Sequence, residues 1–218
     1  MQAPSDRAGP LHTPSRTLVI ACGALARELV DLIRANGWRH LSVQCLPAEL
    51  HNRPERIPEA VRAKIRENRP HHERIFVAYA DCGTGGQLDA VLSAEGVERI
   101  PGAHCYEFFA GAAAFSALAE AEPGTFYLTD FLTRHFDRLV WRGLGLDRHP
   151  ELACQYFGNY RRLVYLAQSE DPELSRQAEA AAKRLGLQYE RRFTGYGGLG
   201  STLAAVARES GEAAVWRG

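Results

Sequence analysis

The sequence predicts an α/β fold with a mostly parallel sheet that is covered by helices on both faces. The main observation is that apolar runs of strand length alternate with helical patterns along the chain. The second is composition: 218 residues, 45% of them apolar and 24% charged, are typical of one sizeable globular core. In such a sheet, ligands bind beyond the carboxyl ends of the strands.

The elements follow one another in pairs. In the first half, apolar runs precede helical patterns at 17–22 and 24–37, 41–46 and 58–68, 74–82 and 85–96, and 99–105 and 107–121. Three further strand-like runs lie at 124–131, 162–168 and 187–198. A helix is expected at 171–186, because this segment has an acidic, proline-containing start and ends at a glycine. We therefore expect one α/β domain over 17–207.

The ends of the chain and its charge restrict the function further. Residues 1–16 are predicted to be a disordered tail and 208–218 a flexible one, and no apolar run has the length of a membrane span. Lys plus Arg and Asp plus Glu number 26 each, so neither nucleic acid nor a membrane is expected as a partner. The sequence predicts a cytoplasmic protein with reduced cysteines.

Four of the five cysteines follow a repeated pattern. Cys22 precedes a glycine and is followed after 23 positions by Cys45, and Cys82 precedes a glycine and is followed after 23 positions by Cys105. The two stretches, 17–50 and 75–109, have the form of two pseudo-repeated βαβ units. We expect the four thiols at the carboxyl ends of strands, on one edge of the sheet.

Thiols that converge at such an edge suit a soft metal. We expect Cys22, Cys45, Cys82 and Cys105 to bind a metal ion, with zinc favoured over an iron–sulfur cluster. The alternative is that these cysteines pack as small apolar side chains. Cys154 lies in a helical pattern and is expected in the core.

Two loops add candidate site residues. In "LPAELHNRPERIP", His51 is a candidate metal ligand or proton-transfer group, and Arg53 a candidate anion-binding group; both are predicted to be catalytic. The alternative is a solvated loop. In "DCGTGG", the predicted anion-binding residues are Gly83, Thr84, Gly85 and Gly86. A tight turn is the alternative there, and also for the similar "TGYGGLG" at 194–200.

Several long motifs resemble a known family. "ACGALARE", "CLPAELHNRPERIP", "YADCGTGG", "HCYEFFAG", "TDFLTRHF" and "FGNYRR" resemble the bacterial and archaeal family called domain of unknown function 1638, over about residues 17 to 200. In methanogens, the genomic neighbours of this family resemble components of corrinoid-dependent methyl transfer. The resemblance therefore implies corrinoid methyltransferase components as partners, although the chain has no corrinoid-binding DxHxxG motif.

The sequence thus predicts a metal-thiolate protein, with a metal-dependent transferase of thiol or methyl-transfer chemistry as the leading hypothesis. Its substrate would be a small molecule, a thiol or a methyl donor. One alternative is a metal-free enzyme, similar to amino-acid racemases, in which Cys22 and Cys82 act as acid and base on a small carboxylate. The other is a non-catalytic metallochaperone or cofactor-insertion protein.

Overall fold

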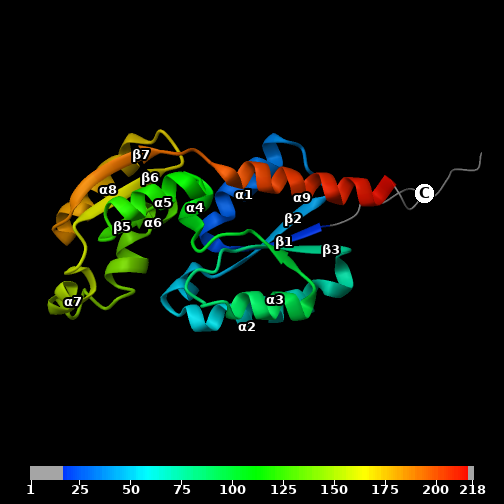
Figure 1. The fold of residues 1–218 in the computed structure, drawn as a ribbon, viewed down its shortest axis with the longest axis horizontal. Helices are drawn as coiled ribbons and strands as arrows, with labels where there is room; N and C mark the ends of the chain where they lie inside the picture. Colours follow the sequence, from blue (N-terminus) through cyan, green and yellow to red (C-terminus); the bar gives the residue numbers. More distant parts are fainter. Residues whose placement is uncertain (1–16, 216–218) are drawn as a thin grey trace, which may run out of the picture.

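The strands of the chain form two parallel sheets, as the computed structural model shows for residues 17–215 (Figure 1). The first sheet has the order β2-β1-β3-β4 and the second has the order β5-β6-β7. The strands are β1 (Thr17–Cys22), β2 (Leu41–Leu46), β3 (Arg74–Ala78), β4 (Glu98–Arg99), β5 (Thr125–Leu128), β6 (Arg162–Ala167) and β7 (Gln188–Phe193). The predicted α/β class with parallel strands is confirmed, and the strands are divided between two sheets.

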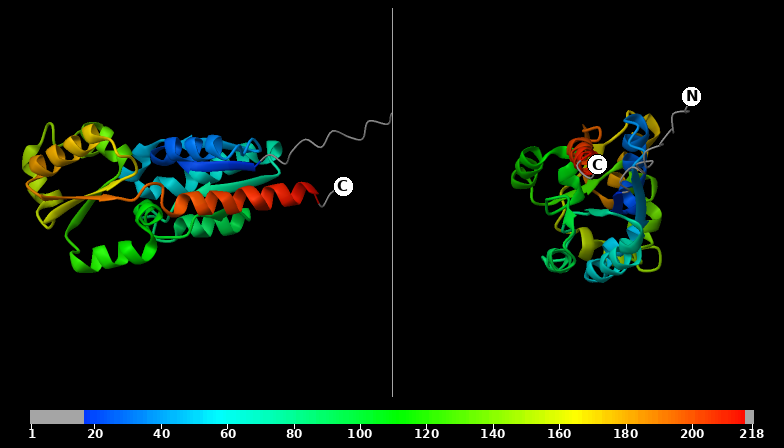
Figure 2. Two further views of the ribbon diagram at one scale, coloured as in Figure 1. Left: turned by 90° about the horizontal axis from the view of Figure 1, so that it is seen from above. Right: turned by 90° about the vertical axis from the view of Figure 1, so that its right-hand side faces the viewer.

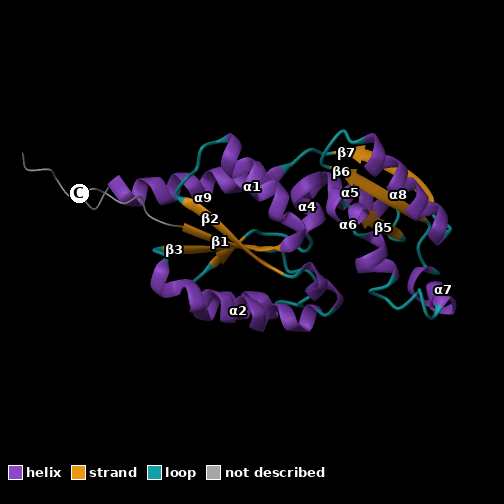
Figure 3. Ribbon diagram, turned by 180° about the vertical axis from the view of Figure 1, so that it is seen from behind, coloured by secondary structure: helices purple, strands orange, loops and turns teal. Residues whose placement is uncertain are grey.

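Helices cover both faces of the first sheet (Figure 3). One face packs against α1 (Ala26–Ala35), α4 (Cys105–Ala110) and α9 (Gly198–Val215), and the other against α2 (Ile57–Asn68) and α3 (Gln87–Glu95). Within β1, Leu18 and Ile20 point to the α2 side whereas Val19 and Ala21 point to the α1 side. A strand buried on both faces needs apolar residues at every position, which explains its uninterrupted apolar run.

The topology of the first sheet creates a crevice. The connection from β1 leads outward to β2, whereas the connection from β3 leads outward in the other direction to β4. The chain segments that follow the two central strands, β1 and β3, therefore lead away from each other, although the strands themselves stay paired to Ala21 and Ala78. Ligands of open α/β sheets bind at such a switch point.

The second sheet is covered in the same way. α6 (Asp130–Arg134) and α8 (Pro172–Leu185) pack on one face, and α5 (Ala112–Ala121) packs on the other with part of α4. α7 is Ala153–Phe157. The remaining short helices are 3-10 turns at Gly23–Leu25, Ala48–Asn52, Pro54–Arg56, Arg69–His71 and Pro150–Leu152, and a π-helical segment at Asp137–Trp141.

The chain passes between the sheets twice, and the two sheets lie toward opposite ends of an elongated molecule (Figure 2). The first passage runs from β4 through α4 and α5 to β5, and the second runs from β7 into α9. At Gly197 in the second passage, φ is +49° and a Cβ atom would lie 2.3 Å from the carbonyl oxygens of Phe108 and Phe109. The glycines of "TGYGGLG" therefore permit close backbone approach between the two passages.

Two details differ from the predictions. β4 is two residues long because Pro101 and Gly102 follow it, so Cys105 begins a helix and does not end a strand. α9 runs to Val215, so residues 208–215 of the predicted tail are helical, and Ser210 is buried where its hydroxyl accepts a hydrogen bond from Thr17. The predicted tail at 1–16 and residues 216–218 lie outside the described residues.

Both βαβ units of the predicted repeat are present, but their cysteines are not equivalent. In the register of β1 and β3, Ala21 pairs with Ala78, so the residue that corresponds to Cys22 is Tyr79. Cys82 lies three positions farther along the chain.

Among the described residues, no helix is long and apolar enough to cross a membrane.

Candidate metal centre

A cluster of one imidazole and two thiols lies at the carboxyl edge of the first sheet. His51, Cys82 and Cys105 each offer one metal-ligating atom, and these three atoms lie within 4.8 Å of one another. Cys22 is adjacent, with its Sγ 3.6 Å from Nδ1 of His51, but it is not part of this mutually close set. We call His51, Cys82 and Cys105 the ligand cluster.

The segment after β2 positions His51. β2 ends at Leu46, and the short helix Ala48–Asn52 turns the chain back across the ends of β1 and β3. Nδ1 of His51 lies 3.2 Å from the carbonyl oxygen of Ala48. Because a carbonyl only accepts, the tautomer with a proton on Nδ1 satisfies this contact and leaves the lone pair of Nε2 free.

Two loops bring the thiols of the cluster together. The N–H of Cys82 donates to the carbonyl of Ala103 at 2.9 Å, and the N–H of Asp81 donates to Gly102 at 3.1 Å. The loop after β3 is thereby joined to the segment that leads to Cys105 at the start of α4. Cys82 has φ of +52°, the only positive value for a non-glycine residue in the described chain. Such strain is typical of functional sites.

A buried hydroxyl accompanies the cluster. Tyr79 is 1% exposed, and its ring stacks on that of His51 with 6.3 Å between the centroids. Among the described residues, the contact of its hydroxyl is with the sulfur of Cys22, a weak acceptor. Burial foremost, and then this sulfur, raise the pKa of Tyr79, so the hydroxyl stays neutral beside the cluster.

The electrostatics couple the thiols to the imidazole. The pKa of Cys82 is lowered to about 5, first by a hydrogen bond from the Cys105 thiol and then by contact with His51. These two effects outweigh burial, which alone would raise the pKa. Burial alone would lower the pKa of His51, but contacts with Cys22 and Cys82 outweigh it and raise the pKa to about 11. The hydrogen bond to Cys82, together with burial, raises the pKa of Cys105. Without a metal, Cys82 is a thiolate beside an imidazolium.

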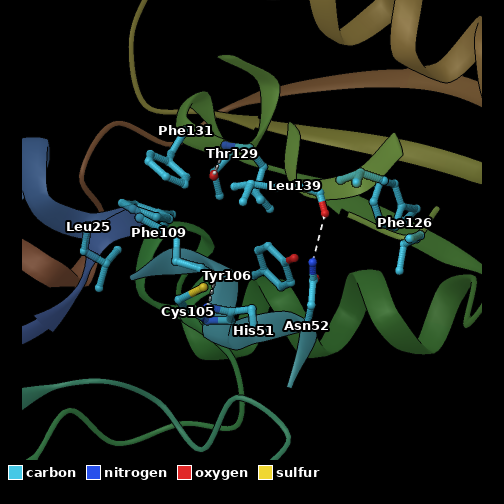
Figure 4. Close-up of a pocket in the computed structure, with 15 residues that line it drawn as sticks. Leu25, His51, Asn52, Cys105, Tyr106, Phe109, Phe126, Thr129, Phe131 and Leu139 are labelled. Atoms are coloured by element: carbon cyan, nitrogen blue, oxygen red, sulfur yellow. Dashed lines mark hydrogen bonds between the residues drawn. The ribbon is translucent and has the colours of Figure 1, made fainter. Parts of the chain in front are cut away.

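A cavity of about 300 Å³ adjoins the cluster, between the two sheets (Figure 4). His51 and Cys105 form part of its wall, and residues of β5, α6 and the segment after α6 form the opposite part. The carboxyl ends of β1, β2 and β5 thus face one space. This arrangement gives the cluster access to a small molecule.

Two predicted site residues, Cys45 and Arg53, lie apart from the cluster, and so does Cys154. Cys45 pairs with Ala21 in the register, so it points to the opposite face of the sheet from Cys22, where it is exposed. Arg53 is exposed and lines a separate depression, because the chain turns at Pro54. Cys154 was predicted to lie in the core but is exposed on α7, at the second sheet.

The glycine-rich loop after β3 binds a carboxylate of the chain itself. Asp81 accepts hydrogen bonds from the N–H groups of Gly85 and Gly86 at 3.1 and 2.9 Å, and from the Thr84 hydroxyl at 2.5 Å. The hydrogen bond from Thr84 is the main cause of the lowered pKa of Asp81, and the bonds from the two N–H groups lower it further. The predicted anion-binding set at 83–86 is therefore already satisfied internally, and the loop serves as a tight turn that positions Cys82.

Sequence reasoning missed two aromatic residues of the site, Tyr79 and Tyr106. Tyr79 directly follows β3, and a strand-end position at a sheet edge was the signal that could have identified it. Tyr106 follows Cys105 and lines the cavity. No sequence pattern indicated it, because its position depends on where α4 begins.

Comparison with known proteins gives one match. No curated protein and no solved structure is significantly similar to the chain. The family model described as protein of unknown function DUF1638 matches residues 45–203, which include His51, Cys82 and Cys105. The chain belongs to this family.

Proposed function

We propose that the protein is an enzyme in which the ligand cluster holds a catalytic zinc ion that activates a thiol for methyl transfer. The observation that carries the proposal is the mutual distance of at most 4.8 Å between the ligating atoms of His51, Cys82 and Cys105. With Zn–S near 2.3 Å and Zn–N near 2.0 Å, a tetrahedral zinc places its ligand atoms roughly 3.5–3.8 Å apart. Small side-chain rotations would bring the three atoms to that spacing.

The donor set favours zinc over an iron–sulfur cluster. Two thiolates and one imidazole with an open fourth position are a ligand set of catalytic zinc sites. An iron–sulfur cluster takes four protein ligands, whereas three ligating atoms lie mutually close here: Cys22 contacts Nδ1 of His51 but is outside this set, and Cys45 and Cys154 lie elsewhere. Since His51 and Cys105 both line the cavity, the open position would face it.

The surroundings of the cluster suit a metal centre. The carbonyl of Ala48 would hold His51 in the tautomer that presents Nε2 to the ion, which is the usual outer-shell arrangement. Cys22 accepts a hydrogen bond from the N–H of Ala24 at 3.3 Å and contacts Nδ1 of His51. We therefore assign Cys22 to orienting His51 and not to ligation.

The chemistry follows from the open position. A zinc-bound thiol loses its proton at neutral pH and remains nucleophilic. Its sulfur would attack the methyl carbon of a donor, so that a sulfur–carbon bond forms while the bond from the methyl group to its carrier breaks. The electron pair of that bond leaves with the carrier, for which a methylated corrinoid is the proposed class. A reducing compartment such as the cytoplasm would keep Cys82 and Cys105 as thiols.

A metal-free cysteine enzyme is the second candidate, because Cys82 and His51 form a thiolate–imidazolium pair when no metal is bound. Cys22 and Cys82 contact the same imidazole, which does not favour a pair that acts from opposite faces of a substrate. A metallochaperone differs from both in releasing its metal to an acceptor without turnover of thiols.

Metal analysis of anaerobically purified protein tests the proposal. We expect about one zinc per chain, and a loss of at least tenfold in zinc content in Cys82→Ser and Cys105→Ser, because a hydroxyl is a poor zinc ligand. Cys45→Ser and Cys154→Ser are matched controls that should retain zinc, since both thiols are exposed and outside the cluster. Full zinc content in both cluster variants, or a metal-free wild type, would overturn the proposal.

A further inference from the structure

The cavity beside the ligand cluster has a mainly apolar wall. Apolar side chains from the parts of the chain around both sheets line it, among them Leu25, Phe109, Phe131, Leu132 and Leu144. None of its lining residues is Asp, Glu, Lys or Arg, and the titratable groups in the wall are His51, Cys105 and Tyr106. The pKa of Tyr106 is raised, mainly by burial, so its hydroxyl stays neutral.

This wall discriminates against charged ligands. A carboxylate or phosphate that enters a largely apolar cavity loses its hydration, and no lysine or arginine lines the wall to compensate for that loss. The lining group that can carry a positive charge is His51, whose charge is already paired with the Cys82 thiolate. The volume of about 300 Å³ is at the lower end for small-molecule sites. A corrinoid is far larger, so such a methyl carrier would approach from outside the cavity.

The polar groups in the wall differ in whether they already make hydrogen bonds within the protein. The amide of Asn52 donates to the carbonyl of Leu139 at 3.2 Å, and the hydroxyl of Thr129 accepts from the N–H of Leu132 at 3.3 Å. The hydroxyl of Tyr106 makes no hydrogen bond to any residue that the structure describes. Figure 4 shows this side chain among those that project into the cavity.

We propose that the cavity binds an uncharged thiol with an aliphatic or aromatic body. The body lies against Phe109, Phe131 and Leu132, and the neutral Tyr106 side chain forms the polar part of the wall beside it. The sulfur takes the open position of the zinc, the thiol proton passes to solvent, and a water molecule leaves that position. The placement of the sulfur rests on the proposed function, whereas the neutral, apolar body rests on the cavity wall alone.

Calorimetry on the full-length, zinc-loaded protein tests the ligand class with three probes. These are 2-phenylethanethiol, 3-mercaptopropionate, which replaces the apolar body by a carboxylate, and 2-phenylethanol, which lacks the sulfur. We expect 2-phenylethanethiol to bind at least roughly tenfold more tightly than either of the others, because only this probe satisfies both the metal and the wall. Tighter binding of 3-mercaptopropionate would overturn the inference.

A substitution in the wall makes the test specific to the cavity. Leu144→Arg adds a cation to a partly exposed lining position, so the affinity for 3-mercaptopropionate should rise at least about fivefold while that for 2-phenylethanethiol falls. Leu152→Arg is the matched control, a partly buried leucine of the same half that does not line the cavity, and it should leave both affinities unchanged. Equal effects of the two variants would contradict the assignment.

The two proposals can fail separately. A wild-type protein without zinc refutes the proposed function, and the wall is then tested by 2-phenylethanol, which should still bind the metal-free protein and be weakened by Leu144→Arg but not by Leu152→Arg. A protein that holds zinc in the cluster but shows no preference for the neutral thiol refutes the inference and leaves the zinc site standing.

Discussion

The carboxyl edges of the two sheets contain polar clusters of different composition. At the second sheet, the carboxylate of Asp130 accepts hydrogen bonds from the Tyr165 hydroxyl at 2.6 Å, the N–H of Gln168 at 2.9 Å and the Ser169 hydroxyl at 2.5 Å. At the first sheet, the Tyr79 hydroxyl contacts the weakly accepting sulfur of Cys22, and the ligating atoms of His51, Cys82 and Cys105 lie within 4.8 Å of one another. The first arrangement is a hydrogen-bond network of a buried carboxylate, whereas the second brings together groups that bind soft metals.

The largest effect should come from breaking the satisfied edge. Asp130→Ala leaves the hydroxyl of Tyr165 and the N–H of Gln168 without their acceptor in a buried site, so we expect the free energy of unfolding to fall by about 3–5 kcal/mol. Chemical denaturation measures this loss. Zinc content per folded chain should not change, and a loss of stability below about 1 kcal/mol would show that the network is not structural.

The same substitution at both edges sharpens the comparison. Tyr165→Phe removes a donor to a buried carboxylate and should cost about 1.5–3 kcal/mol of unfolding free energy. Tyr79→Phe removes a hydroxyl that contacts only the weakly accepting sulfur of Cys22 among the described residues, so the metal-free protein should change by less than about 0.5 kcal/mol or become more stable. Denaturation of the two metal-free variants under identical conditions provides the measurement. Equal losses would mean that Tyr79 has a partner in the folded protein.

The thiolate of the cluster predicts a pH dependence. Since the pKa of Cys82 is lowered to about 5 from an ordinary 9.0, its thiolate contributes stability that is fully present above pH 9 and is lost as the pH falls through 5. Alkylation of metal-free protein, followed by peptide mass analysis, should show Cys82 reacting with an inflection near pH 5. His51→Gln removes a stabilising contact and should move this inflection upward, slowing the reaction at pH 6 by roughly tenfold for each unit by which the new pKa exceeds 6. An inflection of Cys82 near 9 in the wild type would refute the thiolate.

The sequence predicted the elements better than their assembly. Apolar periodicity located β1, β3, β6 and α8, because their burial leaves a direct pattern in the residues. The division into two sheets depends on which strands pair, and that information is not contained in the periodicity of any single strand. The elements could be located and the two sheets could not, because the periodicity of apolar residues indicates which positions are buried but not which strands pair.

The site was predicted in part for a related reason. The strand-end argument identified Cys22, Cys82 and the loop of His51, which the structure brings together. It failed for Cys45, because a shift of one residue along a strand reverses the face to which a side chain points. It failed for the loop 83–86 because Asp81, just before the glycines, occupies the turn itself.

X-ray absorption spectroscopy at the zinc edge tests the central claim most directly, since it reports the atoms bound to the metal. For the wild-type protein without added thiol, we predict two sulfur ligands at about 2.3 Å and two nitrogen or oxygen ligands at about 2.0–2.1 Å, one of them an imidazole. Addition of 2-phenylethanethiol should raise the sulfur count to three. A zinc ion bound by nitrogen and oxygen alone, or by four sulfurs before a thiol is added, would contradict a centre built from His51, Cys82 and Cys105 with an open position.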